Sequence, residues 1–319
     1  MKKTIWVKMF FIGLMASMLL GACSAAAKPA AEAVVLAPVE IYAPASTSSI
    51  PVLLAASQSE QFHVTLYSDQ AQANALFLRG EVPLLVTGLS VGQTLYAQGA
   101  PVQMANSFVS GLSYVVTYGK PIQSFADLAG GELYVPFEGS PIEEICAYFA
   151  AQEGLTWGED ITPMYAPFDS SVALLKEGKA AAVVLPEPFV SLVENEPDLY
   201  ISLDLAALWD GYNPGVNGYP QVGTFVNSQW AAKNADTIAA WNDALAQAIV
   251  ATDNDPQAAV DIVADKYKFP EAVLLKSLSR IGYSFTSGAE MQALVEQYDA
   301  VLGNTSHEND AAFYYLPEK

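Results

Sequence analysis

The sequence predicts an α/β protein built from two similar lobes. From about residue 38 onward, short apolar runs alternate with amphipathic helical stretches, a pattern typical of parallel sheets covered by helices. In addition, residues 75–86 and 173–184 nearly repeat each other, since each segment is a helix end, a glycine and a buried strand. Their spacing, about 98 residues, is too long for a solenoid repeat, so two lobes on one plan is the simpler account.

The elements of the first half follow in order along the chain. Apolar, β-branched and aromatic residues predict strands at residues 39–42, 62–67 and 84–87, with helices between them. Gly80 fits the left-handed position that ends a helix just before the third strand.

The second half has the clearest helix start in the sequence. Ser140 suits the N-cap, Pro141 the first helical position, and Glu143 completes a capping box, which predicts a helix to about residue 152. Gly178 ends a second helix as Gly80 does in the first half. A helical turn is expected at 124–128, strands at 132–135, 161–165, 181–185, 199–203 and 223–226, a turn-rich loop at 209–221, and helices at 236–252, 255–267, 271–279 and 287–302.

The first residues predict export and lipid anchoring. A basic head with Lys2, Lys3 and Lys8 precedes an apolar run that ends in Leu-Gly-Ala-Cys23, which is the pattern of a secretory signal. The tetrapeptide resembles the bacterial lipobox. We therefore expect residues 1–22 to be a removed signal peptide, Cys23 to carry lipid, residues 23–38 to form a flexible tether, and the protein to lie outside the cytoplasm on a cell membrane. The alternative, a membrane-spanning anchor, is disfavoured because the run is short of the roughly 20 apolar residues a span needs.

Charge and cysteine content exclude several classes of function. The net charge of −20 argues against nucleic acid, which demands basic patches, and against direct adhesion to anionic lipid. If Cys23 is lipidated, Cys146 is alone, so no disulfide is possible and the thiol is expected to be inert packing. His63 and His307 are far apart and have no nearby Cys, which argues against a zinc site. No cofactor and no metal are predicted.

Two segments resemble a known family of proteins. Residues 124–136, with Asp127-Leu128 and Gly130-Gly131, and residues 173–189, which end in Pro186-Glu187-Pro188-Phe189, are similar to motifs of the NMT1-like, or SsuA/TauA-like, substrate-binding proteins of nitrate, sulfonate, taurine and thiamine-precursor importers. The resemblance covers about residues 39–300. The chain departs from the family pattern at Ala180-Ala181, where an Asp is usual, and at Val82-Pro83, which leaves the ligand class open.

The resemblance implies a type II-like periplasmic-binding-protein fold and a transport role. It implies a first lobe from residues 39–115 and 224–319, a second lobe from 116–223, hinge crossings near 115–117 and 223–225, and C-terminal helices that return to the first lobe. The ligand is expected at the carboxyl ends of the strands, with closure by a hinge motion. The partners implied are a small-molecule ligand and the permease and ATPase subunits of an ABC importer, and the protein is expected to be a monomer.

The candidate ligand-binding residues lie in loops that follow strands and precede helices, so backbone N–H groups would point into the cleft. For the serines and the aspartate, simple helix capping is the competing interpretation. The candidates are Ser46, Thr47, Gly88, Ser90, Glu138, Gly139, Ser140, Asp169 and Glu187.

The charges of these loops favour a neutral or cationic, heteroaromatic ligand. No basic residue lies in them, and Arg79 and Arg280 lie at or near helix ends, whereas nitrate and sulfonate sites usually need a cationic clamp. A ring could instead stack on aromatic side chains while a carboxylate accepts its N–H groups. Glu187 has a structural alternative as the cap of the helix that begins at Pro188. The aromatic candidates are Tyr42, Phe137 and Phe168.

Two other classes of function are weighed against import. A sensor or structural lipoprotein would keep the same fold without transport, and a neighbouring permease gene would argue against it. An enzyme on this fold is the other alternative. The sequence has no nucleophile elbow, no phosphate-binding glycine loop and no His near a Cys, so no catalytic residue is predicted.

Overall fold

The computed structural model describes residues 37–216, 218–304 and 310–317. The expected signal peptide, Cys23 and nearly all of the expected tether lie outside these residues. Residues 37–319 form one compact unit. In the described part of the chain, no helix is both long enough and apolar enough to cross a membrane.

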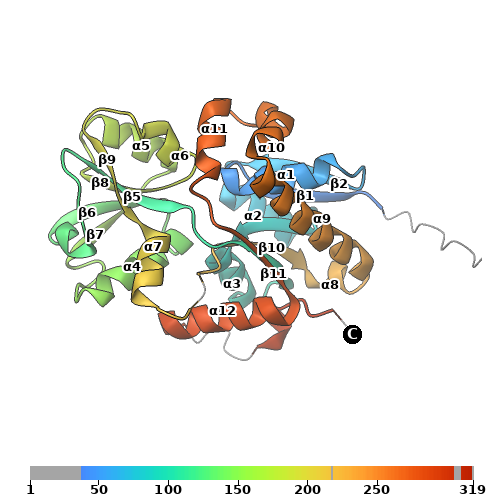
Figure 1. Cartoon of the computed structure of the whole chain (residues 1–319). Coiled ribbons are helices and arrows are strands. Elements are labelled where there is room, and N and C mark those ends of the chain that lie inside the picture. Colours follow the sequence, from blue (N-terminus) through green and yellow to red (C-terminus); the bar gives the residue numbers. More distant parts are fainter. Residues whose placement is uncertain (1–36, 217, 305–309, 318–319) are drawn as a thin grey trace, which may run out of the picture. The chain divides into compact units, whose positions relative to one another are not determined.

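Two sheets organise the described residues (Figure 1). The first has the order β11-β4-β10-β3-β1-β2, in which β1 runs parallel to β2 and β3, and β10 runs antiparallel to β3 and β4. The second has the order β7-β6-β8-β5-β9, in which β6 runs parallel to β7 and β8, and β5 runs antiparallel to β8 and β9. Each sheet with its helices is called a lobe below.

The strand bounds follow the expected runs closely. The first sheet contains β1 (Val39–Pro44), β2 (Phe62–Tyr67), β3 (Leu84–Gly88), β4 (Val102–Val109), β10 (Val222–Asn227) and β11 (Tyr283–Ser287). The second contains β5 (Ser113–Tyr118), β6 (Gly131–Val135), β7 (Ile161–Tyr165), β8 (Ala182–Pro186) and β9 (Leu199–Asp204). Strand β8 is buried along its whole length, as expected of a central strand with both faces covered.

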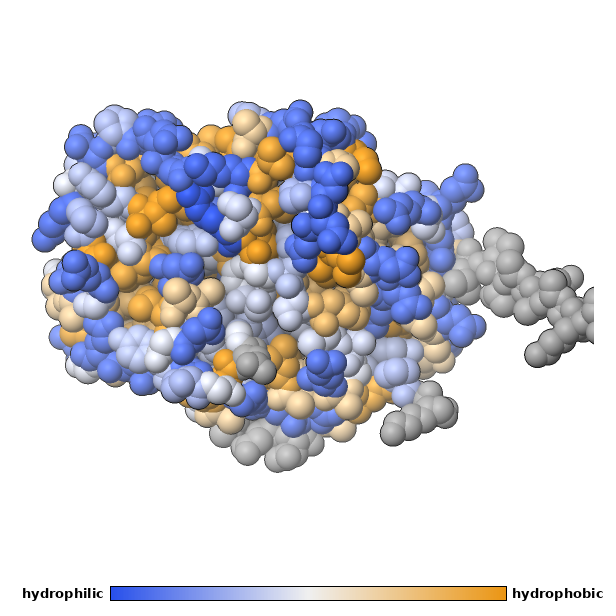
Figure 2. Space-filling view, in the orientation of Figure 1, coloured by the Kyte–Doolittle hydropathy of each residue, from blue (hydrophilic) through white to orange (hydrophobic). Residues whose placement is uncertain are grey.

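Helices cover both faces of each sheet. The first lobe carries α1 (Ile50–Ser57), α2 (Gln70–Leu78), α3 (Leu89–Ala97), α8 (Ser228–Ala231), α9 (Ala235–Asn254), α10 (Pro256–Val263), α11 (Glu271–Leu278) and α12 (Gly288–Leu302). The second carries α4 (Pro141–Gln152), α5 (Phe168–Lys176), α6 (Phe189–Val193) and α7 (Leu205–Tyr212). Short 3-10 helices occupy Thr47–Ser49, Phe125–Leu128, Ala264–Lys266 and Ala311–Phe313. Figure 2 shows hydrophilic side chains spread over both lobes on the face drawn.

The chain changes sheet at two places, and both differ from the expected crossings. The expected crossings at 115–117 and 223–225, and with them the lobe boundaries after residues 115 and 223, fall inside β5 and β10. The structure changes sheet between β4 and β5, where Gly111 has a φ of 145° and where an added Cβ would lie 2.7 Å from the Cβ of Ala206. The second change lies between α7 and β10. In both cases the expected crossing lies in a buried strand next to the loop at which the chain changes sheet.

Several elements were not expected from the sequence, among them strands β4, β5 and β11 and helix α7. Strand β11 lies directly before α12, β4 extends the first sheet before the first change of sheet, and α7 replaces the first part of the expected loop at 209–221. Strand β11 is only partly buried, so it lacks the apolar run that identifies a core strand. Helix α7 begins at the N-cap Asp204, whose side chain accepts from the amides of Ala206 and Ala207.

The two lobes contact each other closely. One hydrophobic cluster takes residues from both, including the rings of Trp209, Tyr219 and Tyr298. The centroid of Trp209 in α7 lies 5.2 Å from that of Tyr298 in α12, and that of Tyr219 lies 6.2 Å from Tyr298 in a stacked arrangement. Such aromatic pairs add to the burial they share. The lobes therefore pack against each other, and this packed state is called the closed arrangement below.

Candidate ligand-binding site

A cavity of about 140 Å³ lies at the carboxyl ends of the strands, with walls from both lobes. The first lobe contributes residues that follow β1 and β3, and the second lobe contributes residues that follow β6 and β8. This is where open α/β sheets bind ligands. The lining residues are Pro44, Ser46, Ser48, Tyr67, Gln70, Thr87, Gly88, Val91, Leu112, Pro136, Phe137, Ser140, Pro141, Ile142, Phe168, Pro186, Gln221 and Val222. None of them carries a charged side chain.

Two helix N-termini meet at the cavity. Gly88 is the N-cap of α3 in the first lobe, and Ser140 is the N-cap of α4 in the second, where its hydroxyl accepts from the amide of Glu143 at 3.1 Å. A Cβ added at Gly88 would lie 2.5 Å from Cγ of Pro141. The lobes can approach this closely at the cavity wall because residue 88 is a glycine.

A group of polar side chains forms the first-lobe wall. The side-chain oxygen of Gln70 accepts from the hydroxyls of Tyr67 at 3.1 Å and Thr87 at 3.2 Å, and Tyr67 also donates to the carbonyl of Val86 at 2.9 Å. Burial raises the pKa of Tyr67 to about 12, so its hydroxyl remains protonated at neutral pH. The wall therefore offers neutral hydrogen-bonding groups that are already oriented.

The side-chain oxygen of Gln221 accepts no hydrogen bond from the described residues. Its side chain is 6% exposed, and its amide nitrogen donates to the hydroxyl of Ser113 at 3.1 Å. Its amide oxygen is buried and has no hydrogen-bond partner among the described residues. Because a buried unpaired acceptor costs about 1–3 kcal/mol, a bound group with an N–H or O–H donor would remove that cost.

The structure gathers some of the nine candidate residues and separates others. Ser46, Gly88 and Ser140 line the cavity, whereas Ser90 and Gly139 line a neighbouring pocket in which the Ser90 hydroxyl donates to the Gly139 carbonyl at 3.2 Å. Glu138 and Asp169 are exposed and belong to neither lining, and Thr47 is fully buried with a hydroxyl that has no partner among the described residues.

The ninth candidate, Glu187, is engaged by other protein groups. It is completely buried, and its carboxylate accepts from the Ser191 amide at 3.1 Å, the Ser191 hydroxyl at 3.0 Å and the Arg280 guanidinium at 3.3 Å. Burial raises the pKa of Glu187, while the Ser191 and Arg280 contacts oppose that rise. These contacts fit the structural alternative, in which Glu187 caps the start of α6.

Sequence reasoning did not single out Tyr67, Gln70, Thr87 or Gln221, whereas Phe137 and Phe168 were already named as aromatic candidates. Thr87 precedes Gly88 at the end of a predicted strand, and Gln221 closes the turn-rich loop before β10, so both stand at recognisable element ends. Tyr67 and Gln70 end β2 and begin α2 and could have been found by the same rule.

The comparisons with known proteins agree with this architecture. Residues 39–259 match the family model described as NMT1/THI5 like. The fold is similar to that of the periplasmic aliphatic sulphonate-binding protein SsuA from Escherichia coli, with a TM-score of 0.72, 17% identity, and 89% of this chain and 94% of that chain covered.

Two further structures are similar in fold. An ABC transporter protein from Parabacteroides distasonis gives a TM-score of 0.68 and 21% identity, with 89% of this chain and 100% of that chain covered. The alkanesulfonate-binding protein SsuA from Xanthomonas axonopodis pv. citri, bound to MOPS, gives a TM-score of 0.68 and 16% identity, with 84% and 94% covered. A comparison with curated proteins found no match. Since the family model spans well over half of the chain, the protein belongs to the NMT1/THI5-like family.

Proposed function

We propose that this protein captures a small neutral, ring-bearing molecule outside the cytoplasm and delivers it to the permease and ATPase subunits of an ABC importer, while a lipid on Cys23 holds it at a membrane. Three groups of facts support the transport role: the family match, the two-lobed fold, and the similarity to proteins named as components of ABC importers. The lipobox-like Leu-Gly-Ala-Cys23 after an apolar run supports the anchor. No catalytic role is part of the proposal.

The observation that carries the ligand class is the uncharged cavity lining with its open acceptor on Gln221. A charged ligand would have to give up its hydration without meeting an oppositely charged side chain among the described lining residues, which is costly. The sequence also allowed a cationic ligand held by a loop carboxylate, but Glu138 and Asp169 are not among the lining residues and Glu187 is paired with Arg280. The rings of Phe137 and Phe168 on the cavity wall suit an aromatic ligand.

The test is a thermal-shift screen of the full chain in detergent micelles. The compounds are aminopyrimidines, flavins, taurine, alkanesulfonates and nitrate. A ligand at 100 times its dissociation constant adds about 2.7 kcal/mol of stability, which raises the melting temperature by several degrees. We expect the shift with an aminopyrimidine or another neutral ring. A shift with sulfonates or nitrate alone would keep the transport role and overturn the ligand class. No shift with any compound would favour a sensor or structural lipoprotein.

A variant pair tests the site. Gln221→Leu removes the open acceptor and should weaken binding about 10-fold to 100-fold, the equivalent of one unsatisfied buried donor on the ligand. Gln98→Leu makes the same chemical change at an exposed position and should leave affinity unchanged. Equal affinities in the two variants would remove Gln221 from the site. Mass spectrometry of the peptide that contains Cys23, from cells and from a Cys23→Ser variant, tests the anchor separately.

A further inference from the structure

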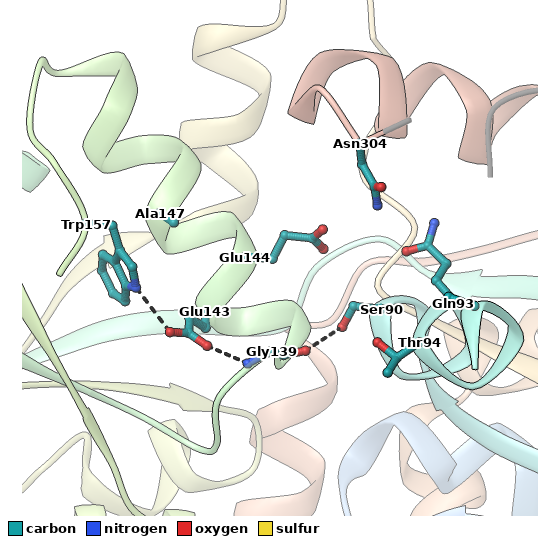
Figure 3. Close-up of a pocket in the computed structure, with 10 residues that line it drawn as sticks. Ser90, Gln93, Thr94, Gly139, Glu143, Glu144, Ala147, Trp157 and Asn304 are labelled. Atoms are coloured by element: carbon teal, nitrogen blue, oxygen red, sulfur yellow. Dashed lines mark hydrogen bonds between the residues drawn. The ribbon is translucent and has the colours of Figure 1, made fainter. Parts of the chain in front are cut away.

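A second pocket lies beside the cavity, between α3 of the first lobe and α4 of the second (Figure 3). We call it the α3–α4 pocket. Its volume is about 380 Å³, which falls within the range of about 300–1,000 Å³ that small-molecule sites occupy. Among the described residues, its lining includes the carboxylates of Glu143 and Glu144 and no Lys, Arg or His. The function proposed above makes no use of it.

The two glutamates of the pocket differ in the hydrogen bonds that their carboxylates accept. Glu143 accepts from the Gly139 amide at 2.6 Å, the Trp157 indole at 3.1 Å and the Tyr165 hydroxyl at 2.7 Å. Its carboxylate therefore fixes the loop before α4. Glu144 accepts a long hydrogen bond from the hydroxyl of Tyr298, at 3.4 Å.

Gln93 faces Glu144 with a fixed orientation. Its amide nitrogen donates to both carboxylate oxygens of Asp299 at 2.9 Å, so the amide cannot be reversed without setting its oxygen against a carboxylate. The side chain is 3% exposed, and its amide oxygen is buried with no hydrogen-bond partner among the described residues. Figure 3 shows this oxygen turned toward the carboxylate of Glu144 across the pocket.

Two acceptors that face each other need a donor between them. A buried unpaired carbonyl oxygen costs about 1–3 kcal/mol, and a carboxylate opposite it adds repulsion between the two oxygens. Burial first, and the nearby charge of Asp299 second, raise the pKa of Glu144 to about 7, which indicates that the protein does not compensate this charge. A cation with several N–H donors would satisfy both groups. The walls at Ala147 and Trp157 add apolar surface for a short alkyl chain.

We propose that the α3–α4 pocket is a second ligand site that binds a protonated amine, with its ammonium group between Glu144 and the side-chain oxygen of Gln93. The ammonium group could come from the free ammonium ion or from a primary alkylamine. Because α3 and α4 belong to different lobes, a bound amine would favour the closed arrangement. The site does not depend on which molecule the neighbouring cavity takes.

The experiment is isothermal titration of the full chain in detergent micelles at pH 8, where Glu144 is mostly ionised. The probes are propylammonium chloride, ammonium chloride, sodium chloride at equal ionic strength, and the neutral 1-propanol. We expect propylammonium to bind with a stoichiometry of one, and neither sodium chloride nor 1-propanol to give saturable heat. Ammonium binding as tight as propylammonium binding would assign the free ion as the source of the ammonium group, and weaker ammonium binding would assign an alkylamine.

Two variants and a control locate the bound cation. Glu144→Gln removes the charge with almost no change in shape and should weaken propylammonium binding about tenfold or more, the equivalent of at least one pKa unit of charge interaction. Ala147→Leu narrows the pocket without touching a polar group and should also weaken binding. Glu60→Gln makes the same charge change at an exposed position in the first lobe and should not. Equal binding of propylammonium and 1-propanol, or affinity unchanged by Glu144→Gln, would overturn the proposal.

These outcomes are independent of the proposed transport function. Gln221→Leu in the main cavity should leave propylammonium binding intact. A protein that binds an amine but no cavity ligand would keep the second site and remove the transport proposal, and the opposite result would do the reverse.

Discussion

The cavity between the lobes and the contacts that flank it use charge in opposite ways. No described residue that lines the cavity has a charged side chain. On one side of it, Glu187 of the second lobe pairs with Arg280, which follows α11 of the first lobe. On another side, Glu143 and Glu144 face α3 across the second pocket. The comparison shows that a charged pair joins the two lobes, whereas under the proposed function the ligand is recognised by shape and neutral hydrogen bonds.

The pair on the first side extends into a small ionic network. Arg280 also pairs with Glu194 at the end of α6, and Glu194 pairs with Lys276 of α11. The ring of Phe189 packs edge-on against Phe269, with centroids 5.2 Å apart. Figure 1 shows α11 next to α6, at the boundary of the two lobes. Helix α11 is therefore a place where the C-terminal part of the first lobe contacts the second lobe through ion pairs and aromatic packing.

The largest effect expected from this comparison is the loss of Arg280. Glu187 is 0% exposed in its side chain and Arg280 is 19% exposed, so Arg280→Met would leave a buried carboxylate without its partner. Removing one member of a buried pair costs about 3–5 kcal/mol. We expect a loss of that size in the free energy of unfolding, measured by urea titration at pH 7.5.

Two further variants show whether burial causes this loss. Lys276→Met removes a cation that is 47% exposed in the same network, and exposed pairs contribute about 0–1 kcal/mol. The double variant Glu187→Leu with Arg280→Met removes both charges and should recover most of the stability. A loss as large for Lys276→Met as for Arg280→Met would contradict the distinction drawn between them.

The next largest effect concerns closure over the cavity. Gly88→Ala places a Cβ 2.5 Å from Cγ of Pro141 in the other lobe, and overpacking of this kind costs about 1–3 kcal/mol. Because the clash is between lobes, the cost falls on the closed arrangement more than on the folding of either lobe. We expect a larger radius of gyration in X-ray scattering, weaker ligand binding, and a small change in the unfolding midpoint.

Gly211→Ala is the matched control for that prediction. Gly211 lies in α7, and an added Cβ there meets no atom within 4 Å, so alanine should be tolerated and should stabilise the helix slightly. A radius of gyration that stays unchanged in Gly88→Ala would mean that the clash is relieved locally, and that the close approach of the two helix starts does not limit closure.

Local patterns in the sequence correctly predicted several helix ends and the two-lobed α/β fold. The capping signal at Ser140-Pro141 corresponds to the observed start of α4, and Gly80 and Gly178 have the positive φ angles expected at helix ends. Two α/β lobes with the cavity at the strand ends were also expected, and the fold is confirmed by the two sheets and the similar structures. These features depend on residues close together in the chain, so one sequence reveals them.

Features that depend on distant contacts could not be predicted in the same way. Glu187 and Arg280 are far apart in sequence, so their pairing, which removes Glu187 from the list of free carboxylates, is visible only in the folded chain. The open acceptor on Gln221 and the facing of Gln93 and Glu144 are likewise products of packing. Sequence reasoning identified which loops surround the cavity, but not which of their side chains the protein leaves unsatisfied.

The smallest expected effect is a pH dependence of the free energy of unfolding that arises at the α3–α4 pocket. Burial and neighbouring charge raise the pKa of Glu144 to about 7 from 4.5, and burial raises that of Asp299 to about 6 from 3.8. A carboxyl whose folded pKa is raised contributes stability that is complete below its unfolded pKa and is lost as pH rises through its folded pKa.

The free energy of unfolding should therefore fall between about pH 5 and pH 8 by on the order of 2 kcal/mol, since the two carboxyls titrate as a coupled pair. The other groups that face them do not reverse the sign: Gln93 is neutral, and the pKa of Tyr298 is raised well above 10. Elsewhere, carboxyls with lowered pKa such as Glu194 titrate below this window. Urea titrations at pH 5, 6.5 and 8 measure the fall. Glu144→Gln should remove about half of it and make the protein more stable than the parent at pH 8. If the variant follows the parent's pH profile, Glu144 is not the group that titrates between pH 5 and pH 8.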